Sequence, residues 1–212
     1  MTTLRQLNSL HRKMKECRAC PQMCSTPVHG PALESPVMLI GQAPGVRESE
    51  SGRPFAYTAG TTLFKWLNIA TGLNEEELRE RIYIAAVARC FPGKSLKGAG
   101  DRVPDAVEIE NCRPHLQAEI EILKPKLIIA VGKVAITEVL GTEIFPKGAS
   151  LADIVGKKVQ ARFHGHEAVV IALPHPSGVS RWPQTEPGKT KLKLALNLLK
   201  KNLMPLLEDL EG

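Results

Sequence analysis

The sequence has no long hydrophobic run, and this absence argues against a membrane-spanning protein. No uninterrupted apolar stretch approaches the roughly 18 residues of a membrane span. The first residues, MTTLRQLNSLHRKMKEC, are basic and amphipathic but contain neither an apolar core segment nor a small-residue cleavage site. Internal repeats and low-complexity segments are absent as well. We therefore expect a soluble, non-secreted protein of the cytoplasm with no membrane partner.

Charge of one sign is in only slight excess. Lys and Arg number 28 against 22 Asp and Glu, which gives a net charge of +6. Such an excess is compatible with a phosphate-bearing partner, although many basic proteins bind no nucleic acid. The chain has 212 residues, of which 43% are hydrophobic, so it is long enough for one buried core. We expect a single domain over residues 1–212.

Cysteine is scarce too: the chain has five, and three of them fall in the segment KECRACPQMC. In a reducing compartment such a cluster favours a metal site or reactive chemistry over disulfides. Cys17 and Cys20 form a C-x2-C pair, and with Cys90 and Cys112 they would supply four thiolates, which suit an iron–sulfur cluster or tetrahedral zinc. Alternatively, Cys90 and Cys112 are buried small residues. In a four-ligand site, Cys24 is either spare or a substitute for Cys20.

Four short runs rich in branched aliphatic residues predict buried strands over 37–41, 83–88, 126–132 and 168–174. Segments with helical periodicity lie at 61–70, 105–123, 133–140 and 190–207. Strands that alternate with helices predict an α/β fold with a parallel sheet covered on both faces.

Unusual residues follow each predicted strand. GQAPG follows the first, Arg89 and Cys90 the second, Gly132 and Lys133 the third, and HPSG the fourth. In open parallel sheets, ligands bind in the crevice beyond the carboxyl ends of the strands. The four signals therefore predict one functional site at that edge of the sheet.

The segments CRACP, VMLIGQAPG, E..SGRPF..TAG, IYIAAVARC, NCRPHLQAEI and HPSG occur in this order over nearly the whole chain. In this combination the sequence resembles the iron–sulfur uracil-DNA glycosylases, family 4 of the uracil-DNA glycosylase superfamily, with some family 5-like features. The resemblance implies a three-layer α/β/α fold around a mainly parallel four-stranded sheet. It also implies a structural 4Fe-4S cluster and hydrolysis of the N-glycosidic bond of uracil in DNA. The cluster ligands would be Cys17, Cys20, Cys90 and Cys112.

The residues agree with that chemistry. The target base must leave the duplex and enter a pocket, where Phe55 is the candidate stacking platform; the alternative is an ordinary core phenylalanine. His175 can donate a hydrogen bond to uracil O2 as negative charge develops there. Because Ala43 offers no carboxylate, the attacking water must be held by backbone carbonyls, by Gln42 or by Glu48.

The other candidate pocket residues have few polar side-chain groups. Family 4 usually places an asparagine at the position of Ala86, and an alanine side chain cannot hydrogen-bond. Selection of uracil over other deaminated bases must then come from backbone groups or neighbours. The other candidate base-contacting residues are Gly41, Ala43, Pro44, Gly45 and Ser177.

The loop FPGKSLKGAGDR, residues 91–102, predicts either a phosphate-contacting segment or a solvated charged loop. Its basic residues are Lys94, Lys97 and Arg102. One glycosylase relative bonds covalently to the sugar through a histidine in a basic insertion here, and no histidine occurs in this loop, so we expect turnover. After HPSG, we expect Val179, Ser180 and Arg181 to approach the duplex, with Arg181 on phosphate.

These observations support three hypotheses. The first is a monomeric uracil-DNA glycosylase that acts on uracil or other deaminated bases at the nucleoid. The second is a DNA-lesion-binding protein of the same fold with weak or lost catalysis, which Gln42, Ala43 and Ala86 would explain. The third, an electron-transfer iron–sulfur protein, is disfavoured because the close-packed cysteine run of ferredoxins is absent.

Overall fold

A computed structural model describes residues 2–96, 100–178 and 180–208 of the chain. Within these residues one five-stranded sheet has the order β2-β1-β3-β5-β4. Four strands are parallel, and β4 pairs antiparallel with β5 at one edge. Their bounds are β1 Val37–Gly41, β2 Tyr83–Ala86, β3 Leu127–Val131, β4 Lys158–Phe163 and β5 His166–Leu173.

The predicted α/β class and the four parallel strands are confirmed, but the prediction of a four-stranded sheet was wrong. The missed strand, β4, has the sequence KVQARF, in which only Ala161 and Phe163 are buried. An edge strand of this kind lacks the continuous aliphatic run that identified the other four. It turns into β5 through His164 and Gly165, both at positive φ, as a tight hairpin requires.

Four long helices are confirmed at or near their predicted positions, and the helices at 3–15, 46–51, 75–79 and 151–154 were not predicted. No helix in the described part of the chain is long and apolar enough to cross a membrane. The bounds are α1 Thr3–Lys15, α2 Val46–Ser51, α3 Thr58–Thr71, α4 Glu75–Arg79, α5 Ala106–Leu123, α6 Lys133–Ile144, α7 Leu151–Ile154, α8 Gly188–Glu208 and the 3₁₀ helix η1 Trp182–Gln184.

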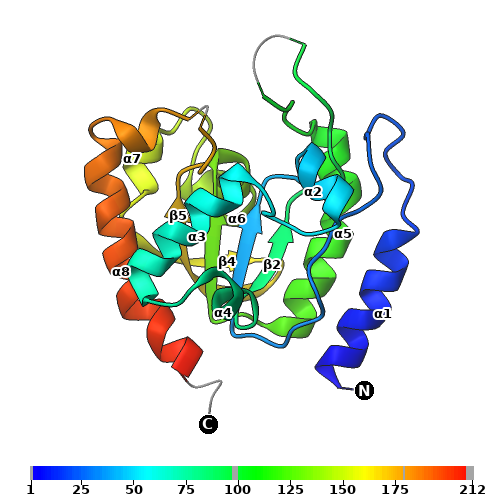
Figure 1. Cartoon of the computed structure of the whole chain (residues 1–212), viewed down its shortest axis with the longest axis horizontal. Helices are drawn as coiled ribbons and strands as arrows, with labels where there is room; N and C mark the ends of the chain where they lie inside the picture. The colour runs from blue at the N-terminus through cyan, green and yellow to red at the C-terminus, as the bar shows by residue number, and fades with distance from the viewer. Residues whose placement is uncertain (1, 97–99, 179, 209–212) are drawn as a thin grey trace.

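Two crossovers place helices on opposite faces of the sheet. The connection from β1 to β2 contains α3 and moves toward one edge, whereas the connection from β2 to β3 contains α5 and moves back past β1. Because such crossovers are right-handed, α3 and α5 lie on opposite faces. α8 packs beside α3 and α1 beside α5, which gives three layers (Figure 1). The connections diverge at β1, so a ligand crevice is expected at its carboxyl end.

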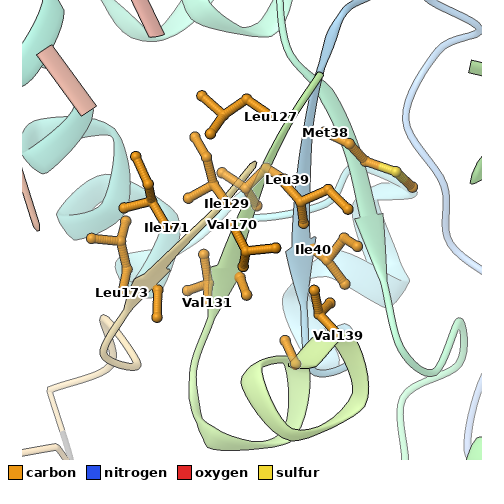
Figure 2. Close-up of a cluster of buried hydrophobic side chains, with 14 of the residues drawn as sticks. Met38, Leu39, Ile40, Leu127, Ile129, Val131, Val139, Val170, Ile171 and Leu173 are labelled. Carbon is orange, nitrogen blue, oxygen red and sulfur yellow. The ribbon is translucent and has the colours of Figure 1, made fainter. Parts of the chain in front are cut away.

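The core lies in and around the central strands. Every residue of β1 and β3 is buried, as expected of parallel strands covered on both faces. Figure 2 shows their side chains packed with those of β5 and with Val139 of α6. Each fully buried Leu, Ile or Val contributes roughly 1.5–3 kcal/mol relative to an exposed one. This rigid sheet fixes where its strand-end loops begin.

A buried polar network ties α1 to the sheet and to α5. His11 Nε2 lies 2.8 Å from the hydroxyl of Tyr83, which donates to Glu119 Oε1 at 2.6 Å. Glu119 also forms an ion pair with Arg89. All four side chains are at most 5% exposed, so their polar groups depend on one another for hydrogen bonds. The network holds the N-terminal helix beside the residue that precedes Cys90.

Candidate active site

A cavity of about 470 Å³ opens at the carboxyl ends of β1, β2 and β5, within the size range of small-ligand sites. It brings together residues that lie far apart in the sequence. Twelve residues singled out from the sequence line it: Gly41, Gln42, Ala43, Pro44, Gly45, Glu48, Phe55, Ala86, Arg89, Lys94, His175 and Ser177. Their shared location matches the expectation that strand-end segments build one site.

Phe55 is held in an unusual backbone conformation at this cavity. Its φ is 52°, in the left-handed region that a bulky residue rarely adopts and that costs of order 1–3 kcal/mol. A Cβ on Gly41 would lie 2.7 Å from Phe55 Cζ, so the ring packs directly on the glycine backbone. A Cβ on Gly60 would lie 1.7 Å from the Phe55 carbonyl oxygen. Both glycines are therefore required for this placement of the ring.

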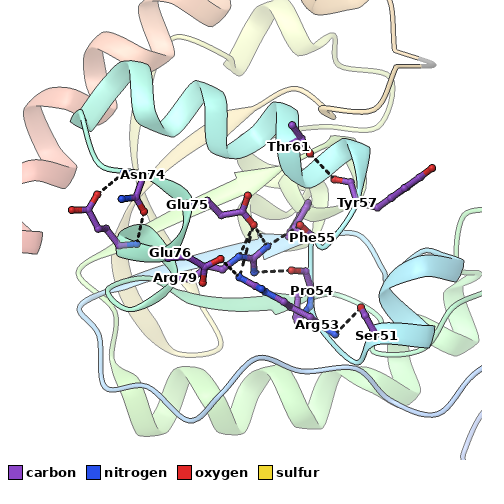
Figure 3. A network of polar contacts seen from close by, with 11 residues as sticks. Ser51, Arg53, Pro54, Phe55, Tyr57, Thr61, Asn74, Glu75, Glu76 and Arg79 are labelled. Carbon is purple, nitrogen blue, oxygen red and sulfur yellow. Dashed lines mark hydrogen bonds and ion pairs between the residues drawn. The ribbon is translucent and has the colours of Figure 1, made fainter.

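Arg79 of α4 stabilises the strained turn from the other side (Figure 3). Its guanidinium donates to the carbonyl oxygens of Pro54 and Phe55, at 2.9 and 2.8 Å. Glu75 accepts from Arg79 Nε at 2.9 Å and orients the guanidinium. Because planar guanidinium donors serve several acceptors at once, one side chain fixes two successive carbonyls. Phe55 is thus preorganised, unlike an ordinary core phenylalanine, and is only partly buried.

His175 follows β5 and has a defined tautomer. Its Nδ1 accepts a hydrogen bond from the Ser177 backbone N–H at 3.2 Å. Burial lowers the pKa of His175 from its usual value, and the nearby Asp101 carboxylate opposes this effect. The ring is therefore neutral near pH 7, with its proton on Nε2. Gly132, at φ 84°, lets the turn after β3 pack against the ring, because a Cβ there would lie 3.0 Å from His175 Cδ2.

Backbone hydrogen bonds fix the loop after β1 against β2. Gly41 and Gln42 carbonyl oxygens accept from the N–H groups of Val87 and Ala88, each at 2.9 Å. Glu48, a candidate for holding the water, is 8% exposed, and its Oε2 accepts from the Gly45 N–H at 3.1 Å. The carboxylate of Glu48 therefore caps the first turn of α2, which positions the loop.

Asp101 also lines the cavity, and the sequence analysis did not single it out. Its Oδ2 and Glu48 Oε2 lie 3.1 and 2.8 Å from the point where a Cβ on Gly45 would stand. The only signal in the sequence is that Asp101 is the one acidic residue in the loop 91–102. Ala86 lies at the end of β2, opposite Gly41, and brings no polar side-chain atom to the cavity.

The candidate DNA-contacting residues in the described part of the chain fall into three groups. Lys94 lies on the cavity wall and donates to Asp101 Oδ1 at 2.7 Å. Arg102 instead makes two hydrogen bonds to Glu108, at 2.5 and 2.6 Å, and does not line the cavity. Ser180 and Arg181 lie just beyond the cavity-lining Ser177, where Ser180 N–H donates to the Ser177 carbonyl. Lys97 and Val179 fall outside the described residues. Contacts to DNA stay predictions for all six.

A second cavity, of about 300 Å³, brings the predicted thiols together. Cys17 and Cys20 come from the segment after α1, Cys90 from the loop after β2 and Cys112 from α5, and all four line it. Cys24 is exposed and does not line it. Burial and the neighbouring thiols raise the pKa of Cys90 to about 12, because a thiolate is disfavoured away from water and beside other thiols.

The donors around this cavity suit sulfur ligands. The Arg89 backbone N–H points to Cys112 Sγ at 3.4 Å, and Asn111 Nδ2 lies 3.5 Å from Cys20 Sγ. Such N–H groups stabilise metal-bound thiolates. Among the described residues, however, no group of three or more His, Cys, Asp or Glu side chains already stands at metal-binding separation. The cavity offers the four thiols without a closed coordination geometry.

The chain is similar to known DNA repair proteins. The family model of the uracil DNA glycosylase superfamily matches residues 27–200. A type-4 uracil-DNA glycosylase of Pyrobaculum aerophilum is 34% identical, over 84% of this chain and 86% of the relative. A type-4 enzyme of Thermotoga maritima is 32% identical, over 72% and 77%, and a type-5 enzyme of P. aerophilum is 29% identical, over 62% of each chain. The chain therefore belongs to the uracil DNA glycosylase superfamily.

Proposed function

We propose that this protein is a monofunctional uracil-DNA glycosylase, which hydrolyses the bond between uracil N1 and the deoxyribose C1′. One observation carries this proposal: a neutral histidine and a preorganised phenylalanine line the same strand-end cavity. The cavity is large enough for a pyrimidine, and its wall contains a basic residue that can face the DNA backbone, Lys94.

The first task of these residues is to hold a base that has left the duplex. A stacked base hides its glycosidic bond, so the nucleotide must rotate out of the helix. The Phe55 ring supplies a stacking surface that needs no reorganisation, because Arg79 and the glycines already fix it. Base selection falls to backbone groups of the loop after β1 and to Ser177, since Ala86 has no side-chain hydrogen-bonding group.

The second task is to stabilise charge as the bond breaks. The electron pair of the C1′–N1 bond stays with uracil, where it spreads to O2, and positive charge develops on the sugar. His175 donates its Nε2–H to O2, and its Nδ1 is held by the Ser177 N–H. A neutral donor placed before the reaction stabilises the developing anion without a proton transfer. Loss of one such donor costs about 10²–10³-fold in rate.

We propose further that Cys17, Cys20, Cys90 and Cys112 hold a 4Fe-4S cluster. The four thiols share one cavity, sulfur is the ligand type that such clusters take, and two N–H donors face the sulfurs. When bound, the cluster supplies covalent links between the segment after α1, the loop after β2 and α5. We also propose that residues 1–212 act as one domain and as a monomer, which sedimentation of the holoprotein tests.

Base release from defined oligonucleotides tests the proposed function. Single- and double-stranded DNA with one uracil is incubated with excess protein and then treated with alkali, which cleaves at abasic sites. We expect cleavage at uracil, a loss of about 10²–10³-fold in His175→Ala, and a smaller loss in Phe55→Ala. His166→Ala, in the β4–β5 hairpin, is the matched control. Intact strands with stoichiometric wild-type protein would refute the proposal.

A second candidate is a lesion-binding protein with little catalysis. Gln42, Ala43 and Ala86 favour it, because Gln42 and Ala43 offer no carboxylate for water and Ala86 offers no amide for the uracil edge. Tight binding to uracil-containing DNA without base release would distinguish it from the glycosylase. A panel with uracil, hypoxanthine, xanthine and a thymine mismatch would show which base, if any, is released.

A further inference from the structure

Asp101 lies in the wall of the candidate active-site cavity, apart from the residues that stack the base and stabilise the departing anion. It lies in a short hairpin in which the Ser95 N–H donates to the Gly100 carbonyl and the Arg102 N–H to the Gly93 carbonyl. Lys94 and Asp101 face one another across this hairpin. Arg102 anchors it to α5 through its two bonds to Glu108. The hairpin base is thus fixed, and with it the position of the Asp101 backbone.

The two oxygens of Asp101 have different surroundings. Oδ1 accepts from Lys94 Nζ at 2.7 Å, which sets the orientation of the carboxylate. Oδ2 faces the loop after β1 and lies 3.1 Å from the Cβ position of Gly45. Glu48 Oε2 lies 2.8 Å from the same position, so the two carboxylates converge on the backbone of Gly45, and Asp101 is the exposed one of the two. Its charge also acts on the ring of His175.

The other candidates for activating water are less suitable. Gln42 has an amide, which can orient a water molecule but cannot accept its proton near pH 7. Glu48 is buried, and its Oε2 is committed to the Gly45 N–H at the start of α2. Ala43 has no polar side-chain atom. Of the two described carboxylates that line the cavity, Glu48 caps a helix and Asp101 does not.

We propose that Asp101 is the general base of this enzyme and that its Oδ2 holds and deprotonates the attacking water. This assignment rests on the proposed glycosylase function. As the C1′–N1 bond breaks, its electron pair leaves with uracil, and water oxygen forms the new bond to C1′. The water proton passes to the Asp101 carboxylate and then to solvent, and the uracil anion takes a proton from solvent. The products are uracil and an abasic site.

In this assignment the two residues serve different steps of the reaction. His175 stabilises the departing anion, and Asp101 takes the proton of the water that attacks C1′. Lys94 engages one carboxylate oxygen, Oδ1, and leaves Oδ2 for the water. General-base assistance of this kind typically contributes about 10²–10⁴-fold in rate.

The test compares Asp101→Asn with the wild-type holoprotein under single-turnover conditions. We expect the rate of uracil release to fall by about 10²–10³-fold. Affinity for DNA with 2′-fluoro-deoxyuridine, which resists cleavage, should stay within about threefold, because binding does not use the proton acceptor. Asp153→Asn, in α7 outside the cavity, is the matched control and should match the wild type. Melting temperatures establish that each variant is folded.

A second variant separates chemistry from structure. Asp101→Ala leaves room beside Gly45, so added formate should restore part of the rate in this variant and none in Asp101→Asn, where the amide fills the space. A folded Asp101→Asn within about threefold of the wild-type rate would overturn the assignment of Asp101 alone. So would a loss that appears only in affinity, or failure of formate to raise the rate of Asp101→Ala. Absence of uracil release by the wild type would overturn the proposed function as well.

Discussion

The two cavities of this protein differ in how their walls are fixed, although both begin at the carboxyl end of β2. The active-site cavity contains Ala86 and the thiol cavity contains Cys90, four residues further along. Arg89 lines both. The first cavity relies on strained backbone, close glycines and a network around Arg79. The second is assembled from three separate segments whose shared feature is sulfur.

The two cavities should therefore respond differently to substitutions in their walls. Preorganised polar and aromatic groups mainly influence the reaction, so changes beside Phe55 or His175 should lower the rate with a smaller effect on folding. The proposed cluster would link three segments through its ligands, so changes to the thiols should affect folding first. The predictions below test this division.

The largest effect is expected at the thiol cavity. Cys112→Ser should lose iron, sulfide and visible absorption, and it should melt at a lower temperature, because its side chain is buried and joins α5 to the other ligands. Uracil release should fall with the folded fraction. Iron and sulfide analysis and thermal melting measure the effect.

Cys24→Ser is the matched control for this experiment. Cys24 is exposed and lies outside the thiol cavity, with its Sγ 3.1 Å from the Cβ position of Gly93. We expect full iron content and normal melting. Loss of the cluster in Cys24→Ser combined with its retention in Cys20→Ser would reverse the assignment of the spare thiol.

The next effect is expected at Gly60. Gly60→Ala would place a Cβ 1.7 Å from the Phe55 carbonyl oxygen, a backbone atom that cannot move without displacing the strained turn. We expect a destabilisation of about 3 kcal/mol or more and a loss of about 100-fold in uracil release. Chemical denaturation and single-turnover rates measure both. Gly30→Ala is the control, since its Cβ would meet only the Ile84 carbonyl, at an ordinary 3.7 Å.

A smaller effect is expected at Arg79, because replacing this residue leaves the turn at Phe55 in place but weakens the hydrogen bonds that hold it. Arg79→Lys has one ammonium group, which cannot bond the two carbonyls of Pro54 and Phe55 while pairing with Glu75 as the guanidinium does. We expect about 10-fold slower uracil release and a loss of about 1–3 kcal/mol. Arg162→Lys, an exposed residue of β4, should change neither quantity. Equal rates for Arg79→Lys and the wild type would show that Phe55 needs no support from α4.

The sequence predicted those features of the fold and of the cavities that depend on the local pattern of residues. The continuous aliphatic runs of β1 and β3 are buried on both faces, so they identified the strands directly. Strand ends then located the cavity, because parallel strands bring their following loops to one edge. β4 was not predicted, because only Ala161 and Phe163 of this strand are buried and most of its other residues are polar.

The parts that were missed depend on contacts between distant segments. Asp101 belongs to the active-site cavity only because its hairpin folds back over Gly45, and no periodicity records such a contact. The sequence also did not indicate that Arg102, a predicted phosphate contact, pairs with Glu108 in the first turn of the following helix. The strain at Phe55 could not be inferred either, since the sequence does not show its φ.

The smallest effect on uracil release is expected at His11, which tests the polar network beside the thiol cavity. Burial, together with the charges of Arg89 and Lys15 and the neighbouring His29, lowers the pKa of His11 to about 4. Tyr83 and Glu119 complete the groups that face it. The unfolded chain binds a proton at His11 near pH 6.5, whereas the folded protein does not, so stability falls as the pH drops from 6.5 toward 4. At pH 5, protonation of His11 in the unfolded chain lowers the free energy of unfolding by about 2 kcal/mol relative to pH 7.

In His11→Gln that part of the pH dependence should vanish, although the variant is less stable at pH 7 because a buried partner of Tyr83 has changed. Denaturant unfolding at both pH values measures the difference, and parallel pH curves for wild type and variant would place the titrating group elsewhere.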